Sequence, residues 1–425
     1  MTAPSFKRTK FACYAAYFTM SSIFCLPPLL FVTLHETYNI SYTLLGTLVL
    51  VNFITQLAID LIFTVFSKKF KFQSIIKITP LITSLGLFIY ALIPMLFENI
   101  AYVGLLIGTV LFSVSAGFSE VLLSPTIAAI PSDNPQRDMS LLHSLYAFGV
   151  FTVVVISTVF LKIFDTDKWM YLTMFFALLP VIAAVLFMIS PMPDMEQSSA
   201  ANNVEATKKR AWSFAFCVAC IFFGSCAENA MSNWISSYME KSLHIDKAVG
   251  DLLGMAGFAI LLGLTRIGYA KWGKKITRIL LVGMIGAAVC YLVVGLMPGI
   301  IPAFIACVLT GIFTSMLWPG SLIMMEENVP APGVGAYALM AAGGDLGAAI
   351  SPQLMGIVID KVSASQLAAD LSQTLHLTTE QIGLKAGMLV TSIFPILGII
   401  AVLLTVRYFK ANKSQSQTLP LDSET

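Results

Sequence analysis

The chain has 425 residues, of which 57% are hydrophobic and only 11% are charged, and its mean hydropathy is +0.84. Soluble proteins carry about 25% charged residues, so this composition excludes a protein that is surrounded by water on all sides. The formal net charge of +2 comes without a long basic tract, so nothing indicates a nucleic-acid partner. We therefore predict an integral membrane protein whose surroundings are the lipid bilayer.

Long apolar runs follow one another along the whole chain. A helix that crosses a bilayer needs about 20 mostly apolar residues. The run after the short basic segment Met1 to Lys10 is too long for a signal-peptide core, so we interpret it as the first spanning helix. Twelve such helices are predicted, at residues 11–33, 42–66, 74–97, 101–130, 138–163, 168–191, 212–238, 248–272, 276–297, 300–325, 333–360 and 383–409.

The most polar internal stretch lies between the sixth and the seventh predicted helix, as expected for a linker between two halves. A short basic turn follows the second helix of each half, at 66–72 and at 269–275. The fold prediction is an all-α membrane protein with twelve transmembrane helices in two pseudo-symmetric six-helix bundles. Its parts are an N-terminal bundle (1–191), a cytoplasmic linker (192–211), a C-terminal bundle (212–410) and a disordered cytoplasmic tail (411–425).

Lysine and arginine predict the orientation. With the N-terminus in the cytoplasm, 19 of the 25 basic residues fall on the cytoplasmic side, which satisfies the positive-inside rule. We expect a multi-pass protein of the inner (plasma) membrane with both termini in the cytoplasm, working as a monomer. The six basic residues left outside are Lys162, Lys168, Lys241, Lys247, Lys361 and Lys385.

Glu120 lies inside the fourth predicted helix, where an ionised carboxylate costs a few kcal/mol. Ser113, Gly117, Glu120 and Ser124 are spaced by four, three and four residues, so they share one helical face that is expected to line a cavity. A carboxyl group in a low-dielectric site can bind and release a proton near neutral pH. Glu120 is therefore a candidate for proton coupling, and the alternative is a buried structural partner of a hydroxyl, amide or arginine on a neighbouring helix.

The seventh helix repeats this arrangement, with Ser225, Glu228, Ser232 and Ser236 spaced by three, four and four residues. Glu228 is the second candidate for proton coupling, with the same structural alternative.

Three further charged residues complete the candidates inside the membrane. Asp345, between glycines near the middle of helix eleven, is a third candidate for proton coupling, with close helix packing as the alternative. Asp60 and Arg266 lie nearer the cytoplasmic side and are candidates for gating, with structural pairing of Asp60 and snorkelling of Arg266 as alternatives. Asp251 is interpreted as a helix-start acid that the macrodipole favours.

Aromatic rings and amides are suitable for a sugar-like solute, because rings stack on its faces and amides bond its hydroxyls. Tryptophan and tyrosine also anchor helices at membrane interfaces, and histidine also packs structurally, so both interpretations stay open. The candidates for substrate binding are His143, Tyr146, Asn229, Asn233, Trp234, Trp318 and Gln353.

Several segments carry a family resemblance. The twelve helices in six-plus-six form, with a central linker and basic turns after helices two and eight, resemble the major facilitator superfamily. Five segments are similar to its fucose permease and sugar:proton symporter subgroup: SAGFSEVLLSP (115–125), SLLHSLYAFG (140–149), GSCAENAMSNWISSYM (224–239), LWPGSLIMM (317–325) and ALMAAGGDLGAAISPQLMGIVID (338–360).

The resemblance implies a role for Glu120, which occupies the place of that subgroup's proton-coupling glutamate in helix four. The subgroup's second proton-coupling acid, an aspartate in helix one, has no counterpart here, so Glu228 or Asp345 is expected to substitute. The loop after helix two also departs from the superfamily's gating motif, because it has Ser67, Lys68 and Lys69 where an acidic and a basic residue are expected.

The sequence thus predicts a secondary active transporter that moves a small polar solute, with a sugar favoured, by alternating access and in symport with protons. An exporter of drugs or metabolites is the first alternative, although helix five has one glycine where drug/proton antiporters carry a glycine-rich motif. An organic-anion carrier would want cationic groups at mid-membrane, and a non-transporting nutrient sensor would add a long signalling extension. We expect no enzyme activity, no cofactor and no metal, because no nucleophile with its base or cluster of metal ligands is visible.

Overall fold

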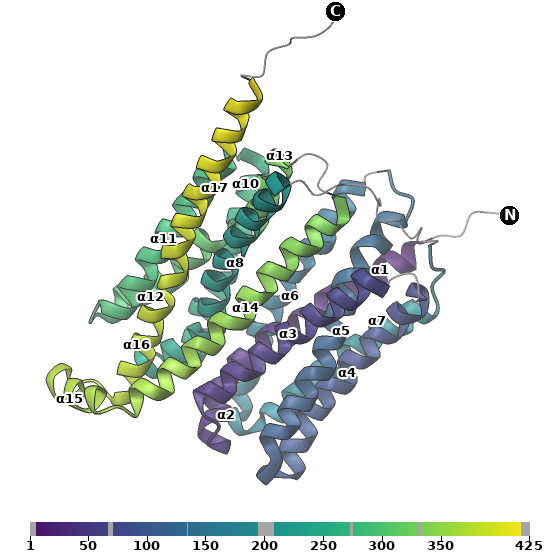
Figure 1. Cartoon of the computed structure of the whole chain (residues 1–425). Helices are drawn as coiled ribbons and strands as arrows, with labels where there is room; N and C mark the ends of the chain where they lie inside the picture. Colours follow the sequence, from purple (N-terminus) through teal and green to yellow (C-terminus); the bar gives the residue numbers. More distant parts are fainter. Residues whose placement is uncertain are drawn as a thin grey trace, which may run out of the picture.

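The structure of the protein is a computed structural model, and it describes residues 6–66, 71–133, 135–193, 208–272, 275–329 and 333–417. Two groups of helices lie side by side in it (Figure 1). The N-terminal half contains α1 (Lys7–Leu29), α2 (Phe31–Tyr38), α3 (Tyr42–Phe66), α4 (Phe72–Leu96), α5 (Ala101–Ala129), α6 (Pro135–Phe164) and α7 (Trp169–Met188), with 3₁₀ turns at Glu98–Ile100 and Thr166–Lys168.

The C-terminal half contains α8 (Lys208–Ser237), α9 (Lys247–Val249), α10 (Ala256–Trp272), α11 (Ile276–Leu296), α12 (Ile300–Thr314), α13 (Leu317–Asn328), α14 (Gly333–Ser363), α15 (Gln366–Leu375), α16 (Thr379–Thr391) and α17 (Ile393–Gln417). Two π-helical segments, Tyr238–Ser242 and Gly250–Met255, extend α8 and precede α10. Helices α3 and α14 pack side by side where the two halves meet (Figure 1).

The predicted twelve-helix membrane fold is confirmed. Eleven spans among the described residues are long and apolar enough to cross a membrane, and a shorter apolar helix, Phe148–Phe164, supplies the remaining one. Three spans are divided by a helix break: α1 and α2, α12 and α13, and α16 and α17. The first break follows Pro27 and Pro28, because neither proline can donate a backbone hydrogen bond to the preceding turn.

Some boundaries differ from the prediction. The short helix α15, between the eleventh and twelfth spans, was not predicted from the apolar runs, because it is amphipathic rather than apolar. Helix α17 continues to Gln417, so the first seven residues expected in a disordered tail are helical; alanine, lysine and glutamine in this stretch are good helix formers. Most of the predicted linker, and Ser67, Lys68 and Lys69, lie outside the described residues.

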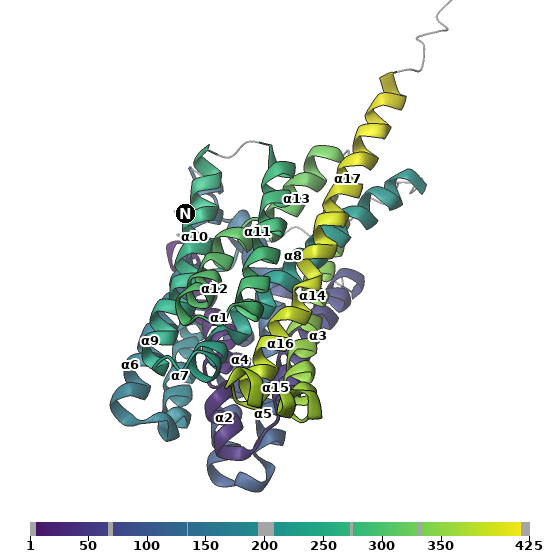
Figure 2. The ribbon, with the colours of Figure 1, turned by 90° about the vertical axis from the view of Figure 1, so that its left-hand side faces the viewer.

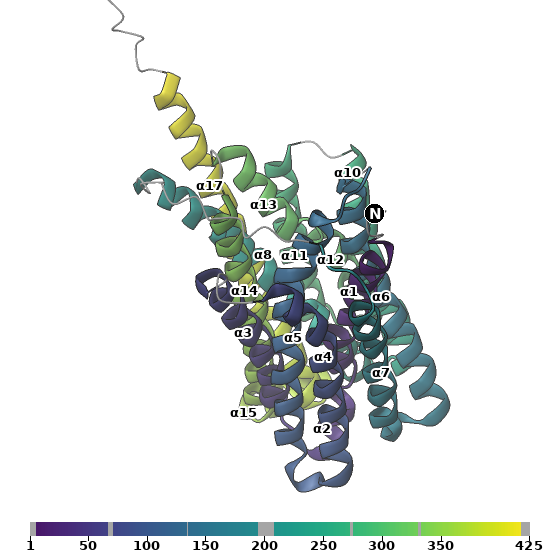
Figure 3. The same cartoon turned by 90° about the vertical axis from the view of Figure 1, so that its right-hand side faces the viewer.

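Helices α2 and α15 lie at the end of the molecule opposite to the last turns of α17 (Figures 1 and 2). This is the end that the lysine and arginine distribution predicts to be extracellular, and we call it the outer end. On the side shown in Figure 3, α4, α5 and α7 form the outside of the N-terminal bundle. The two spans that join the halves, α3 and α14, lie along one face of the molecule (Figures 2 and 3).

A carboxylate joins the two halves at the outer end. Asp360 of α14 accepts hydrogen bonds from the backbone N–H groups of Tyr42 (3.1 Å) and Thr43 (2.6 Å), the first residues of α3. The N–H groups of a first helical turn have no partner within the helix, and an acid placed there also meets the positive end of the helix dipole. Asp360 therefore caps a helix of the opposite half, and the Tyr42 hydroxyl donates to Glu380 beside it.

The backbones of α3 and α14 also approach closely here. A Cβ atom on Gly356 would lie 2.3 Å from the carbonyl oxygen of Tyr42, and one on Gly46 would lie 3.0 Å from the Pro352 oxygen. Only glycine permits this approach, so the packing itself holds the halves together at the outer end.

Lysines form the other contacts between the halves at this end. The Lys247 ammonium donates to the Leu29 carbonyl (2.8 Å), which is the last carbonyl of α1. Lys162 pairs with Asp246 (2.9 Å) and lowers the pKa of that exposed carboxyl group, and Lys241 pairs with Glu36.

Near the opposite end, Thr9 donates to Pro191 (2.5 Å) and Lys10 pairs with Asp138, both within the N-terminal half. The molecule is therefore closed at its outer end.

The cap of α3 by Asp360 gives a first prediction. Asp360→Ala is expected to open the outer end, because it leaves two backbone donors without their charged partner, and hydrogen bonds to charged groups contribute about 1.5–3 kcal/mol. Spin labels on Ile100→Cys and Leu375→Cys, exposed residues of the two halves, would report a longer mean distance and an open fraction raised about tenfold or more. The native cysteines are all buried, so background labelling is small.

The matched control for this prediction is Asp370→Ala, which removes a carboxylate that, among the described residues, accepts a hydrogen bond only from Gln366 of the same helix. It is expected to leave the distance distribution unchanged. An Asp360→Ala distribution that is identical to that of the wild type would contradict a role of the cap in closing the outer end.

Candidate functional site

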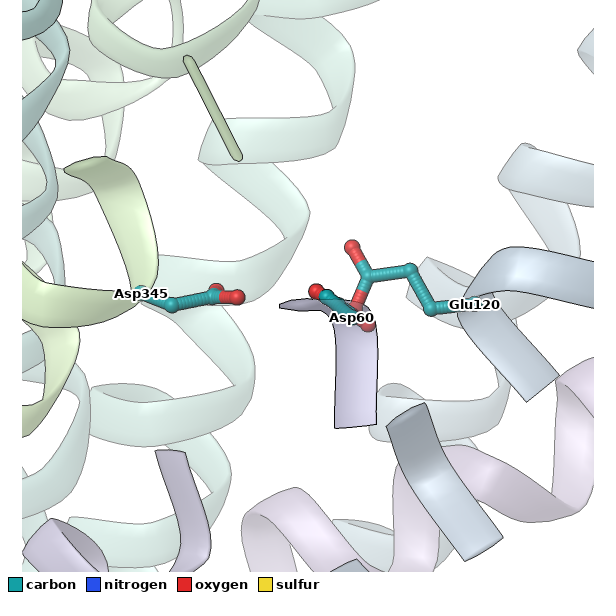
Figure 4. A group of neighbouring side chains, drawn as sticks. All are labelled: Asp60, Glu120 and Asp345. Carbon is teal, nitrogen blue, oxygen red and sulfur yellow. The ribbon is translucent and has the colours of Figure 1, made fainter. Parts of the chain in front are cut away.

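Three acids from three helices meet inside the membrane. Asp60 of α3, Glu120 of α5 and Asp345 of α14 each place a carboxylate oxygen within 4.8 Å of the other two. In Figure 4, Asp345 points from one side and Glu120 from the other, with Asp60 between them. Asp345 is buried, and the other two side chains are partly buried. We call these residues the acid cluster; it joins two acids of the N-terminal half to one of the C-terminal half.

A polar contact between α3 and α5 positions the N-terminal part of the acid cluster. Asn52 accepts hydrogen bonds from Gln56, one turn further along α3 (3.0 Å), and from Ser113 of α5 (2.6 Å). One turn after Ser113, a Cβ atom on Gly117 would lie 2.8 Å from the Ile59 Cβ atom. The two helices are thus held in close contact beside the acid cluster.

This contact corrects the prediction that the polar face of the fourth span lines a cavity. Ser113 is fully buried against Asn52, and Gly117 packs on α3. The small residues serve close helix packing in a membrane, and Glu120 is the group of this face that reaches the acid cluster. The Ser124 side chain lies outside the described residues.

Glycines position Asp345. A Cβ atom on Gly344 would lie 2.3 Å from the ring of Trp318, and one on Gly347 would lie 2.4 Å from the Phe222 carbonyl oxygen. Helix α14 therefore packs closely on α8 and α13, and Asp345 is buried at this contact. Its Oδ2 atom has no hydrogen-bond partner among the described residues.

The acid cluster cannot hold three negative charges without compensation. At the effective dielectric constant of about 20 that describes protein sites, two ionised carboxylates less than 5 Å apart repel each other by about 3 kcal/mol. A proton, a cation or a basic side chain must therefore compensate part of this charge. The only ligands that the acid cluster offers are carboxylate oxygens, which suit a proton or a hard cation.

A second charged group lies between α8 and α10. The Arg266 Nη2 atom is 3.3 Å from both carboxylate oxygens of Glu228, and its Nε–H donates to the Ser315 carbonyl oxygen (2.8 Å). The side chains remain 37% and 20% exposed, so the pair borders open space. Arg266 thus pairs with Glu228 instead of extending toward the membrane surface, which was the alternative interpretation of its position.

The break between α12 and α13 explains why Arg266 binds at Ser315. Residue 319 of a regular helix would donate its N–H to the carbonyl of residue 315, but Pro319 has no N–H. The helix resumes with Gly320, which donates to the Met316 carbonyl (2.8 Å). The Ser315 carbonyl is left free by Pro319 and accepts from Arg266 instead.

Two tyrosines of the N-terminal half face this pair. Tyr146 of α6 lies within electrostatic range of Glu228 and Arg266, and Tyr17 of α1 lies within range of Glu120 and Arg266. The Tyr146 ring makes an edge contact with Phe24, at 5.8 Å between ring centres. Glu228 and Arg266 therefore lie near the N-terminal half, whose helices α6 and α1 pack against α10 and α8.

The other predicted binding residues are placed differently. The Asn229 amide donates to the Ser225 carbonyl (3.1 Å), and that of Asn233 donates to the Asn229 carbonyl (2.8 Å), so both bond within α8. Trp234 is fully buried, donates to the Pro352 carbonyl (3.1 Å) and contacts Phe31 of the opposite half. These contacts support the closed outer end.

Two candidates remain apart from both groups. Gln353 lies where α14 crosses α3, and its Oε1 atom is buried without a hydrogen-bond partner among the described residues. His143 belongs to α6, but its side chain lies outside the described residues.

Asp251 lies in the first turn of the helical segment Gly250–Met255, at the helix start predicted from its position. It is also buried, accepts a hydrogen bond from Ser236 of α8, and lies 3.5 Å from the Lys247 ammonium. Asp251 thus pairs with the lysine that reaches across to Leu29.

Sequence reasoning missed Asn52, Gln56 and Tyr17. The signal for the first two was present, because Asn52, Gln56 and Asp60 are spaced by four residues and so form a polar face on α3. Tyr17 gave no such signal, since a single tyrosine in an apolar helix has no distinctive pattern.

Solved structures with the same architecture are numerous. A bacterial homolog of the human lysosomal transporter Spinster, inward-facing and occupied, has a TM-score of 0.76 at 13% identity over 95% of this chain and 97% of that chain. A D-xylose-proton symporter has a TM-score of 0.73 at 14% identity over 92% and 97%. The E. coli fucose:proton symporter has a TM-score of 0.56 at 13% identity over 94% and 99%. At these identities the likeness concerns the fold.

Sequence comparison gives the family. A search of curated proteins finds no match. The family description of the Major Facilitator Superfamily, in contrast, matches residues 11–352, which is most of the chain and includes the acid cluster and the pair of Glu228 and Arg266. Together with the twelve-span fold, this match establishes that the chain belongs to the Major Facilitator Superfamily.

Proposed function

We propose that this protein is a secondary active transporter that couples the movement of a small polar solute, with sugars favoured, to the movement of protons in the same direction. The observation that carries the proposal is the acid cluster, whose three carboxyl groups come from both halves of the molecule. Closure at the outer end supports an inward-facing state within an alternating-access cycle.

The position of the acid cluster gives a physical route for coupling. Asp60 and Glu120 move with the N-terminal half and Asp345 moves with the C-terminal half, so a rocking motion changes the distance between them. The repulsion between ionised carboxylates varies with that distance. Binding or loss of a proton at the acid cluster therefore changes the relative free energies of the two conformations, and that is the requirement for coupled transport.

A neutral polar solute suits the groups around Arg266. The pair of Glu228 and Arg266 offers acceptors and donors within electrostatic range of Tyr146, whose ring contacts Phe24. Two structures of the same fold are proton symporters of D-xylose and of fucose, which makes hexoses and pentoses the first solutes to test.

Export in exchange for protons is the second candidate, and it is favoured by the same acid cluster. An excess of acids between the halves also suits a cationic solute, which would replace the proton as the compensating charge. Direction of transport separates the two functions, since a symporter accumulates its solute inside under an inward proton gradient and an exchanger does not.

Glu120→Gln is expected to uncouple transport. The amide keeps the size of the side chain but cannot release a proton, so proton-driven accumulation of solute should fall at least tenfold while exchange of labelled for unlabelled solute persists. The measurement is uptake of neutral pentoses, hexoses and deoxyhexoses into liposomes containing the protein, with and without an inward proton gradient. Replacing the proton gradient by a sodium gradient tests a hard cation as the coupling ion.

The matched control is Glu98→Gln, which changes an exposed glutamate in the 3₁₀ turn just before α5. It should accumulate solute as the wild type does. Gradient-driven accumulation that survives in Glu120→Gln would rule out this carboxyl group as the coupling site, and transport of amphipathic cations but of no sugar would favour the exchanger.

The charge balance of the acid cluster gives a prediction on stability. Asp345→Asn should raise the melting temperature of the detergent-solubilised protein by a few degrees at pH 8, because it removes one of three mutually repelling carboxyl groups. Asp251→Asn should lower it, since that acid pairs with Lys247 and accepts from Ser236. A fall for both variants would contradict repulsion within the acid cluster.

A further inference from the structure

We infer that Arg266 and Glu228 together bind hydroxyl groups of a neutral solute, and that Pro319 positions Arg266 for this by freeing the Ser315 carbonyl. The inference rests on the proposed function and assigns the pair to solute recognition, whereas the acid cluster carries the coupling ion. Arg266 and Glu228 are binding residues here, and Pro319 is a positioning residue.

The first step of the argument is the anchor of Arg266. Pro319 removes the N–H that a continuous helix would direct at the Ser315 carbonyl oxygen, and the Arg266 Nε–H occupies that acceptor at 2.8 Å. A guanidinium group is planar and rigid, so one bond at Nε fixes the directions of the other four N–H groups. The broken helix thus determines where the Arg266 fork points.

The second step is the capacity that remains for binding. Nη2 lies 3.3 Å from both Glu228 oxygens, which is a long contact for a charged pair. The Nη1 atom has no hydrogen-bond partner among the described residues. Since Arg266 and Glu228 are 37% and 20% exposed, donors and acceptors are both accessible side by side. A hydroxyl group both donates and accepts, so it matches this combination.

The third step is the charge of the solute. The pair is neutral as a whole, and it faces the N-terminal half, where Tyr17 and Tyr146 lie within electrostatic range of Arg266. Glu120 also lies within range of Tyr17, so a second negative centre is near. An anionic solute would be repelled by these acids, and a cation would compete for the acid cluster. A neutral polyhydroxylated solute fits the pair best.

The experiment compares Pro319→Ala and Arg266→Lys with the wild type in the liposome uptake of neutral pentoses, hexoses and deoxyhexoses. Alanine restores the N–H at 319, which competes with Arg266 for the Ser315 carbonyl, and lysine keeps the charge but cannot contact Ser315 and Glu228 with one fixed fork. For both variants KM should rise about tenfold or more, as expected for loss of a charge-assisted hydrogen bond, with the maximal rate kept within about twofold. The double variant should be no worse than Arg266→Lys alone.

Pro180→Ala is the matched control. It replaces another proline inside a spanning helix, α7, that lies in the N-terminal half away from the pair, and its KM should equal that of the wild type. Retained exchange at saturating solute shows that the variants are folded.

The outcomes separate the two proposals. If the wild type accumulates a sugar and KM is unchanged in Pro319→Ala and Arg266→Lys, the inference fails and the proposed function stands. A raised KM in Pro319→Ala and Pro180→Ala alike would also overturn it, since the effect would then be a general one of helix prolines. If the wild type neither accumulates nor exchanges any sugar, the proposed solute and the inference fail together, and a preference for organic anions would reverse the charge argument.

Discussion

Repulsion between acids in a low-dielectric interior is the constraint on which the central region depends. Asp60, Glu120 and Asp345 lie within 4.8 Å of one another, while Gly117 packs α5 closely on α3 and Gly347 packs α14 closely on α8. In this conformation the scaffold holds the acids together, and a proton, a cation or a basic side chain must compensate part of their charge. Since Asp345 belongs to the opposite half, the same constraint that disfavours full ionisation also connects ion occupancy to the arrangement of the halves.

Backbone groups released by proline or by a helix end are used repeatedly as binding partners. Pro319 frees the Ser315 carbonyl for Arg266, and the last carbonyl of α1, after Pro27 and Pro28, accepts from Lys247. In a membrane such groups cannot be satisfied by lipid, so a side chain from another helix must reach them. The breaks after α1 and after α12 therefore each create a specific contact between helices, and the contact at Leu29 joins the two halves.

The sequence predicts the twelve spans well, because hydrophobic length depends on the chain alone. It also identified Glu120, Glu228 and Asp345, since intramembrane acids stand out in apolar runs. Their pairing could not be predicted: Asp60 and Asp345 lie 285 positions apart and meet only because α3 crosses α14. For the same reason the polar face around Ser113 was interpreted as a cavity wall, although it packs on Asn52. The spacing of polar residues along one helix does not predict which other helix packs against its polar face.

The two groups of acids at the α3–α14 contact differ in one physical respect. At the outer end Asp360 is compensated by two backbone N–H groups of the opposite half, so its charge attracts the halves to each other. Further along the same pair of helices, the acid cluster sets carboxyl groups of the two halves against each other. The attraction at Asp360 and the repulsion within the acid cluster favour the same motion. This motion closes the outer end and separates the two halves on the cytoplasmic side of the acid cluster. Neutralising the acid cluster would remove only the second force and would leave the cap by Asp360 in place.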